Sequence, residues 1–421
     1  MSTSLLTKPQ LRIATAGSVD DGKSTLIGRL LHDTKTIFED QLDAVAKASR
    51  RYGDQEMNLA LLTDGLRAER EQGITIDVAY RYFATPNRSF VLADTPGHAQ
   101  YTRNMVTGAS VSDVALVLVD ARHGVMEQTR RHLAIAALLG VNTIVLTVNK
   151  MDLVGWNPTT FASIVSDVET VLKDVDSAVS FHAIPVSALN GDNIVDRSAN
   201  TPWYEGPTVL DLLESIEIDE TDAPIGARLA VQWTIRSGAD YRGYAGQLAG
   251  GPLKVGDDIN VLPSGHRSTI RSLTIAGTGV DRARPGDAIA IEINDHVDVG
   301  RGDVLVAANA GTAASVGTGV VADVCWMNES PISVHDRVVV KHLTRQVGAS
   351  VTRIVHRLSP ETLERLPTDQ LSLNDLGRLE LTLDEPIVAD SYARSRSTGH
   401  LVIIDEATNA TAGAAAIISL G

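Results

Sequence analysis

The sequence G-S-V-D-D-G-K-S at residues 17–24 constrains the fold of this 421-residue chain more than any other stretch. It matches the phosphate-loop pattern G-x-x-x-x-G-K-[ST] at every fixed position. A short apolar run at residues 11–16 is typical of a buried strand, and residues 24–32 have the apolar spacing of a helix. Because the motif needs this order of strand, glycine turn and helix, the sequence predicts an α/β domain that binds a nucleoside triphosphate.

The chemistry of the phosphate loop follows from its residue types. Gly17 and Gly22 let the backbone curl so that successive N–H groups point at phosphate oxygens. Lys23 adds a positive charge at the outer phosphates, and the Ser24 hydroxyl is placed to ligate Mg²⁺. The residues expected to contact the phosphates are Gly17, Ser18, Val19, Asp20, Asp21, Gly22, Lys23, Ser24 and Thr25. Two carboxylates in an anion-binding loop are unusual, and the sequence leaves open whether they point away from the phosphates or toward a cation.

A second motif identifies the base. Asn149-Lys150-Met151-Asp152 follows the strand expected at residues 143–148 and matches N-K-x-D. The Asp152 carboxylate accepts hydrogen bonds from the ring N–H and the amino group of guanine, whereas adenine offers no such pair of donors. We expect Asn149 to tie the base-binding loops together and the Lys150 stem to cover the ring.

A third segment follows the strand expected at residues 183–186. It consists of Ser187, Ala188 and Leu189, and a backbone N–H there would meet the guanine carbonyl oxygen.

Two segments are candidates for switches that sense the γ-phosphate. Asp94-Thr95-Pro96-Gly97-His98 follows the strand expected at residues 90–93. Asp94 would hold Mg²⁺ through a water, the Gly97 N–H would meet the γ-phosphate, and His98 would orient the attacking water. The alternative for His98 is a turn histidine bonded to backbone. In the other segment, residues 73–76, Thr75 would give its hydroxyl to Mg²⁺ and its N–H to the γ-phosphate, and hydrolysis would release both contacts.

These motifs together predict a GTPase whose ligands are GTP and Mg²⁺. The residues expected to have catalytic roles are Lys23, Thr75 and His98, and those expected to bind the metal are Ser24, Thr75 and Asp94.

Composition limits the compartment and the partners. The net charge of −15 argues against sequence-independent binding to nucleic acid and against binding to an anionic membrane. The single cysteine, Cys325, excludes an intrachain disulfide, fits a reducing compartment and is expected to be a buried structural thiol. No secretory signal is evident, and the longest apolar runs are too short to span a bilayer. We therefore expect a cytoplasmic protein.

The pattern of strands changes along the chain. Residues 11–215 alternate apolar strands with helices, which indicates a parallel sheet covered on both faces. A polar, helix-prone insertion at residues 33–70 is expected to pack on the rim of the sheet through Leu42, Val45 and Ala46 on one face and Leu59, Leu62 and Leu66 on another. From about residue 225, short strands separated by glycine turns predict a β-barrel. A Gly/Ala-rich linker at 307–314 and a second β-rich block follow.

The expected architecture is an α/β P-loop GTPase domain at 1–220 followed by two all-β barrels at 221–312 and 313–421. The strands expected in the first barrel are 228–236, 258–262, 266–276 and 287–293, and those in the second are 320–327, 337–342, 349–356, 378–383 and 401–404. Tyr241, Arg242 and Tyr244 form either a contact patch or an ordinary barrel turn.

This architecture, with D-T-P-G-H in the second switch, resembles the translation elongation factor superfamily. The longer patterns at residues 17–31, 70–83, 242–246 and 408–413 are similar to the large GTPase subunits of bacterial heterodimeric sulfate adenylyltransferases (ATP sulfurylases). The resemblance implies an elongation-factor-like three-domain protein in a heterodimer with a small catalytic subunit, which binds ATP and sulfate and forms adenosine 5′-phosphosulfate and pyrophosphate. GTP hydrolysis on this chain would drive that transfer, the switches at Thr75 and His98 would touch the partner, and nucleic acid and membrane are not expected partners.

The same motifs occur in proteins with two other functions. A translation factor that delivers aminoacyl-tRNA commonly has arginine where this chain has Gln72 and threonine where it has Ser24. A non-hydrolysing GTP-binding scaffold is disfavoured because Lys23, Thr75 and His98 are intact. Some relatives carry a fused adenylylsulfate kinase domain, but this chain ends at Gly421 without a second phosphate loop, so no kinase activity is expected.

Overall fold

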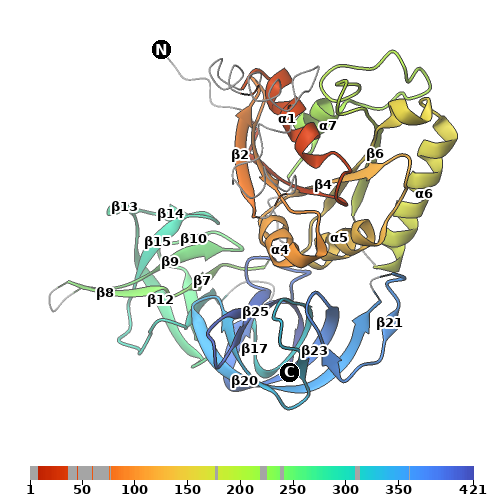
Figure 1. Ribbon diagram of the computed structural model, residues 1–421. Coiled ribbons are helices and arrows are strands. Elements are labelled where there is room, and N and C mark those ends of the chain that lie inside the picture. Colours follow the sequence, from red (N-terminus) through yellow and green to blue (C-terminus); the bar gives the residue numbers. More distant parts are fainter. Residues whose placement is uncertain are drawn as a thin grey trace, which may run out of the picture. The chain divides into compact units, whose positions relative to one another are not determined.

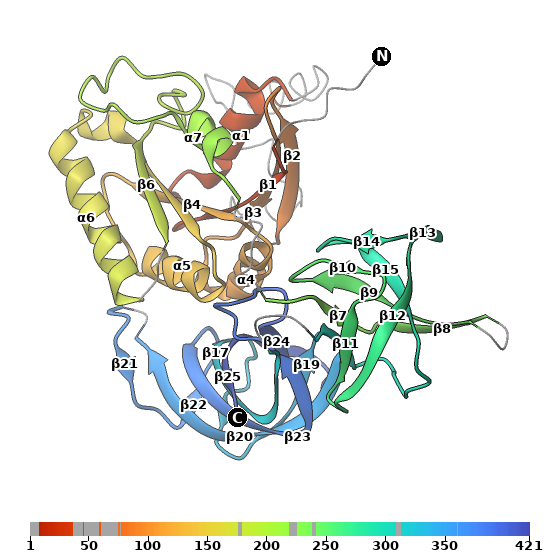
Figure 2. The same cartoon turned by 180° about the vertical axis from the view of Figure 1, so that it is seen from behind.

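The computed structural model describes residues 8–36, 45, 59, 75, 77–175, 179–218, 225–237, 241–308, 313–359 and 361–421. The chain divides into two compact units, Met1–Ile218 with Ser359–Glu364, and Asp219–Leu358 with Arg365–Gly421. The first unit holds an α/β sheet, and the second holds two antiparallel barrels (Figures 1 and 2). No helix in the described ranges combines the length and the apolar content that crossing a membrane requires.

The first unit is built on a sheet with the strand order β2-β3-β1-β4-β5-β6. The strands are β1 (Leu11–Ala16), β2 (Ala79–Ala84), β3 (Ser89–Asp94), β4 (Val114–Asp120), β5 (Thr143–Asn149) and β6 (Ser180–Pro185). β2 runs antiparallel to β3, whereas the other neighbours are parallel. Every residue of β4 is buried, as expected for a central strand covered on both faces. The parallel sheet predicted from the apolar runs is confirmed.

Helices cover both faces of this sheet (Figure 1). They are α1 (Lys23–Asp33), α4 (Thr102–Ser110), α5 (Glu127–Leu138), α6 (Pro158–Asp174) and α7 (Val209–Ser215), with short 3₁₀ turns η2 (Ala99–Tyr101) and η3 (Met151–Val154). α1 and α7 share one core with β1, β3 and β4, and the apolar face expected at Leu26, Ile27, Leu30 and Leu31 is buried in it. α4 and α5 lie on the opposite face (Figures 1 and 2).

The insertion expected at residues 33–70 lies mostly outside the described residues, including Leu42, Ala46, Leu62 and Leu66. Val45 and Leu59 are described, and both are buried. A Cβ on Gly28 of α1 would come 2.2 Å from the Leu59 carbonyl oxygen, so the insertion packs closely on α1 at this point.

The second unit begins with a closed six-stranded barrel. Its ring has the order β11-β16-β7-β9-β15-β12, and the β11–β12 pairing closes it. The strands of this region are β7 (Arg228–Ala230), β8 (Trp233–Ser237), β9 (Tyr241–Ala249), β10 (Leu253–Lys254), β11 (Asp258–Leu262), β12 (His266–Ile275), β13 (Thr278–Val280), β14 (Arg282–Ala283), β15 (Ala288–Ile293) and β16 (Val304–Ala307). Closure removes the unpaired sheet edges of the ring.

A second closed barrel follows, with the ring β19-β24-β25-β17-β23-β20 closed by the β19–β20 pairing. The strands are β17 (Ser315–Trp326), β18 (Ile332–Ser333), β19 (Arg337–His342), β20 (Arg345–Leu358), β21 (Arg365–Leu366), β22 (Gln370–Leu371), β23 (Leu376–Ala389), β24 (His400–Asp405) and β25 (Thr411–Leu420). Cys325 is fully buried in β17, as predicted. The expected succession of one α/β domain and two barrels is confirmed.

Some expectations about the barrels were wrong in detail. Residues 228–236 form two strands, β7 and β8, rather than one. Tyr241, Arg242 and Tyr244 lie within strand β9 and do not form a turn. β9 contains glycine because β7 approaches it closely: a Cβ on Gly246 would lie 2.3 Å from the Ala230 carbonyl oxygen. The expected domain boundaries near 220 and 312 fall among residues outside the described ranges and stay predictions.

A buried ion pair joins the two barrels of the second unit. Arg228 of β7 donates from Nε and Nη2 to the two Asp390 carboxylate oxygens, at 3.2 Å each. The two side chains are only 2% and 3% exposed, and the Thr398 hydroxyl donates to Asp390 at 2.8 Å. With bidentate geometry and an additional hydrogen bond, the pair meets the conditions under which buried charges are tolerated.

We expect Asp390→Asn to destabilise the second unit. The substitution leaves the Arg228 guanidinium buried without its counter-charge, a loss of about 3–5 kcal/mol of unfolding free energy. Urea denaturation of the whole chain measures it. As a control, Asp384→Asn removes the exposed partner of Arg337 and is expected to change stability little. Equal, small effects of the two substitutions would contradict the prediction.

Candidate functional site

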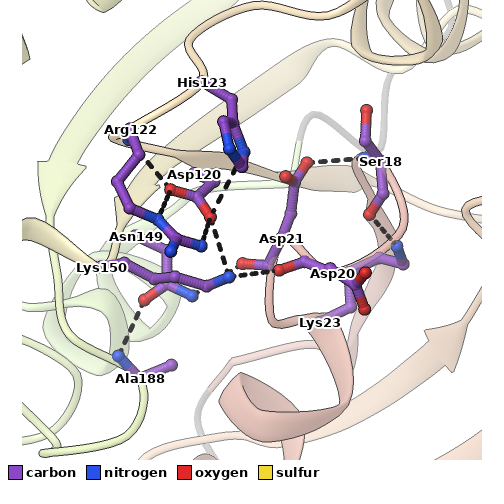
Figure 3. Close-up of polar contacts among 10 residues, drawn as sticks. All are labelled: Ser18, Asp20, Asp21, Lys23, Asp120, Arg122, His123, Asn149, Lys150 and Ala188. Carbon is purple, nitrogen blue, oxygen red and sulfur yellow. Dashed lines mark hydrogen bonds and ion pairs between the residues drawn. The ribbon is translucent and has the colours of Figure 1, made fainter. Parts of the chain in front are cut away.

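The predicted nucleotide-binding motifs gather at the carboxyl ends of the parallel strands. The phosphate loop follows β1, the D-T-P-G-H segment begins at the last residue of β3, and the N-K-x-D motif begins at the last residue of β5. Carboxyl ends of parallel strands lie at one edge of a sheet, where α/β proteins bind their ligands. Figure 3 shows the polar contacts among ten residues of this edge.

The phosphate loop has the backbone that its glycines predict. Gly17 and Gly22 have φ of 139° and 95°, and α1 begins directly after Gly22. A Cβ on Gly17 would lie 2.6 Å from the Leu118 carbonyl oxygen, and one on Gly22 would lie 2.4 Å from the Asn149 amide nitrogen. Both positions therefore require glycine, because a Cβ would clash with these neighbours and because a positive φ is strained for other residues. The loop presents the start of α1, with its unpaired N–H groups, as an anion site.

Lys23 is almost fully buried at the base of the loop. Its ammonium donates to the carbonyl oxygens of Gly17 at 3.0 Å and Ser18 at 2.8 Å. Burial lowers the pKa of Lys23, and the carboxylates of Asp21 and Asp94 act in the opposite direction. A Cβ on Gly97 would come 2.3 Å from the Lys23 Nζ and 2.8 Å from the Gly17 carbonyl oxygen. The structure thus brings the D-T-P-G segment directly against the phosphate loop.

The expected Mg²⁺ ligands are oxygen donors on adjacent elements. Ser24 lies in the first turn of α1, and Asp94 is buried at the end of β3. Asp94 accepts a long hydrogen bond of 3.4 Å from the Thr15 hydroxyl, and Thr95 donates from its hydroxyl to the Thr15 carbonyl oxygen. A hydroxyl and a carboxylate suit Mg²⁺, which prefers oxygen ligands. Thr75 is half-buried, but its neighbours lie outside the described residues, so its metal-binding role stays a prediction.

His98 makes the backbone contact expected of a turn histidine. Its Nδ1 accepts the Gln100 N–H at 3.2 Å, and its ring lies 6.2 Å from that of Tyr101. In a neutral imidazole, a nitrogen that accepts leaves the proton on the other nitrogen. The neutral His98 ring therefore carries its proton on Nε2 and offers a hydrogen-bond donor there. The turn contact fixes this tautomer rather than competing with a role toward a ligand.

Asn149 joins three of the predicted loops (Figure 3). Its amide donates to the Asp21 carbonyl oxygen at 2.7 Å, and its Oδ1 accepts the Ala188 N–H at 2.9 Å. The side chain is 2% exposed. The phosphate loop, the N-K-x-D segment and the segment Ser187–Leu189 are thus held together through one amide.

Lys150 links the N-K-x-D segment to the phosphate loop and to the end of β4. Its ammonium donates to the Asp20 carbonyl oxygen at 2.5 Å and pairs with Asp120 at 2.8 Å. Arg122 also binds Asp120 through two side-chain hydrogen bonds of 3.0 and 2.7 Å. Burial raises the pKa of Asp120, but the hydrogen bonds from Arg122 and Lys150 outweigh it and hold the pKa well below its ordinary value.

The other predicted base-binding residues differ in exposure. Met151 is fully buried, Asp152 is half-buried in η3, and Leu189 is 57% exposed. Arg29 of α1 donates from Nε to the Ala188 carbonyl oxygen at 3.3 Å and from Nη2 to that of Leu189. Arg29 therefore fixes the turn that carries the expected guanine-binding N–H.

Sequence reasoning missed the residues that support these loops, namely Arg29, Asp120, Arg122, Thr129 and His132. Asp120 offered a signal, because it is a carboxylate at the end of an otherwise apolar strand. Thr129 and His132 offered a weaker one, as polar residues three apart on a helix. The Gly17 N–H donates to His132 Nδ1 at 3.1 Å, and the hydroxyls of Ser18 and Thr129 lie 3.3 Å apart.

His132 is neutral at physiological pH. Burial is the main cause that lowers its pKa to about 3, and the charges of Lys23 and Arg131 act in the same direction. A neutral ring is what the Gly17 N–H requires, since only an unprotonated nitrogen accepts a hydrogen bond.

This neutral histidine predicts a loss of stability in acid. Below its ordinary pKa of 6.5 the unfolded chain takes up a proton that the folded chain refuses until about pH 3. Between pH 7 and pH 5 this difference removes about 2 kcal/mol of unfolding free energy. Urea denaturation at both pH values measures this loss. His132→Asn retains an acceptor for the Gly17 N–H but has no imidazole to protonate, so its unfolding free energy should fall by about 2 kcal/mol less than that of the wild type between these pH values. Identical pH dependence of the two proteins would contradict the assignment.

Comparison with known proteins agrees with this geometry. The family model for the elongation factor Tu GTP binding domain matches residues 8–219, and the model described as GTP-eEF1A C-terminal domain-like matches residues 319–418. Sulfate adenylyltransferase subunit 1 of Citrobacter koseri is 48% identical over 97% of this chain and 86% of the relative. The subunit 1 proteins of Aliarcobacter butzleri and Salmonella paratyphi C are 47% and 46% identical over 97% and 98% of this chain, and 87% and 86% of theirs. The resemblance inferred from the motifs is confirmed: the chain belongs to the sulfate adenylyltransferase subunit 1 family and carries an elongation-factor-type GTPase domain.

Proposed function

We propose that this chain is the subunit of a heterodimeric sulfate adenylyltransferase that hydrolyses GTP to drive adenosine 5′-phosphosulfate formation on a partner subunit. The observation that supports the proposal is the Asn149 side chain, which is hydrogen-bonded to the phosphate loop at Asp21 and to the segment Ser187–Leu189 at Ala188. The relatives' designation as subunit 1 supports a second subunit. That subunit would bind ATP and sulfate and release pyrophosphate.

In this proposal different residues of the site bind the phosphates, the base and the metal ion of GTP. Lys23 and the N–H groups of the phosphate loop bind the phosphates, and Asp152 accepts the two guanine donors. Ser24, Thr75 and Asp94 would hold Mg²⁺, which when bound offsets the negative charge of the phosphates.

The attack of water on the γ-phosphate depends on the D-T-P-G-H segment. The Gly97 N–H meets the γ-phosphate, and the Nε2–H of neutral His98 donates to the attacking water or to a γ-phosphate oxygen. His98 acts here by orientation, because the nitrogen that faces the reaction already carries a proton. Release of the cleaved phosphate frees Gly97 and Thr75, and we infer that the partner senses this change.

The deciding experiment mixes the chain with a candidate small subunit, ATP, sulfate and GTP. GTP-dependent formation of adenosine 5′-phosphosulfate is expected, because hydrolysis supplies free energy to an unfavourable transfer. Tight binding of aminoacyl-tRNA without that product would support the translation-factor alternative. Binding of GTP without turnover in either setting would support a non-hydrolysing scaffold.

His98→Ala tests the coupling. GTP hydrolysis and its stimulation of sulfate activation are expected to fall about 100-fold, because the donor that orients the water is lost. Nucleotide affinity should be retained, since the loops that bind the base and phosphates are untouched. His98→Gln keeps a side-chain N–H donor and should lose less. If His98→Ala still couples normally, the assigned role is wrong.

Asp152→Asn tests the choice of base. The amide replaces an oxygen acceptor with a donor that faces the guanine amino group, so GDP affinity should fall about 100-fold or more. Xanthosine diphosphate has a carbonyl in place of that amino group and should bind the variant more tightly than the wild type. Fluorescence titration with both nucleotides measures the two affinities. Asp167→Asn, an exposed change on α6, is the control, and equal preferences in the two variants would refute the role of Asp152.

A further inference from the structure

Asp21 is a buried carboxylate inside the phosphate loop. The side chain is 4% exposed, and its Oδ2 accepts the Ser18 N–H at 2.6 Å (Figure 3). In the same turn the Asp21 N–H donates a longer bond of 3.4 Å to the Ser18 carbonyl oxygen. A Cβ on Gly17 would lie 3.2 Å from Asp21 Oδ2, so the carboxylate packs closely against the Gly17 backbone. This answers the question that the sequence left open for Asp21: the carboxylate is turned inward onto the loop's own backbone.

The hydrogen bond and the charge of Asp21 have different consequences. The bond stiffens the turn between Gly17 and Gly22, which helps the loop to hold its shape before a ligand arrives. The negative charge, however, lies within the loop that has to attract phosphates. An uncharged acceptor at this position would stiffen the turn without placing a negative charge in the loop.

The charges around Asp21 do not cancel its effect completely. Burial raises the pKa of Asp21 above its ordinary value, although the hydrogen bond from the Ser18 N–H and the charge of Lys23 act in the opposite direction. Lys23 is also the only residue of 17–25 with a positively charged side chain. In a buried site, water and salt screen such interactions weakly, so a fixed carboxylate near Lys23 reduces its attraction for a polyphosphate.

We propose that Asp21 lowers the affinity of the loop for guanine nucleotides through its charge, while its oxygen braces Ser18. The consequence is faster nucleotide release than the same loop would show with an uncharged acceptor. The proposal rests on the proposed GTP-binding function and adds a determinant of how tightly that site holds its product.

The test compares Asp21→Asn, Asp21→Ala and the wild type. Asparagine retains an oxygen that accepts the Ser18 N–H and removes the charge, whereas alanine removes both. Binding of a fluorescent GDP and its rate of dissociation are measured at low and high salt. Asp167→Asn removes one negative charge from an exposed position on α6 and serves as the matched control.

We expect Asp21→Asn to bind GDP about tenfold more tightly, mainly through slower dissociation, and to keep this gain at high salt. Asp21→Ala should bind more weakly than Asp21→Asn, because the brace is lost. If Asp21→Asn melts like the wild type yet binds GDP equally or more weakly, the inference is overturned. If the wild type itself fails to bind guanine nucleotides, it is the proposed function that fails.

Discussion

The two hydrogen bonds of the Asn149 amide are the constraint on which the nucleotide site depends. One reaches the Asp21 carbonyl oxygen in the loop after β1, and the other comes from the Ala188 N–H after β6. These partners are 128 and 39 residues away in sequence, so nothing local brings them together. Because Asn149 ends the buried strand β5, the rigid sheet sets its position, and the loops on either side are fixed relative to it. A site built in this way is largely pre-formed, which limits the ordering cost of binding.

The positively charged side chains of this site lie close to carboxylates of the same site. Lys23 is buried near Asp21 and Asp94, and Lys150 is shared between Asp120 and a backbone carbonyl oxygen. The buried Lys23 ammonium thus lies close to two carboxylates, which offset part of the cost of its burial. The overall charge of −15 says little about such a site, because the balance is local. An acidic protein can hold a polyphosphate where backbone N–H groups and one buried ammonium converge.

Much of the fold was predictable from the sequence, and the exceptions have physical causes. β4 and β5 were evident because both of their faces are buried, which requires continuous apolar runs. β9 and β25 were missed because they are rich in Gly and Ala, which have low strand propensity. The motif loops were predictable because phosphate and guanine demand particular residue types at fixed spacing. His132 and Arg29 were not, because their roles follow from contacts between distant segments that no spacing rule encodes.

The two candidate switches are attached to one hairpin. Thr75 precedes β2, the D-T-P-G-H segment begins at the end of β3, and Ala79 pairs with Asp94. At the other end of this hairpin the buried Arg88 donates to the carbonyl oxygens of Pro9, Leu213 and Ile216 at 2.9, 3.1 and 2.5 Å. Two of these carbonyls lie at the carboxyl-terminal end of α7, so the far end of the hairpin is anchored to the helix after which the chain leaves the first unit. Loss of the γ-phosphate would therefore free both switches at one end of a hairpin whose other end is held, and the resulting motion would be confined to the segments next to the nucleotide.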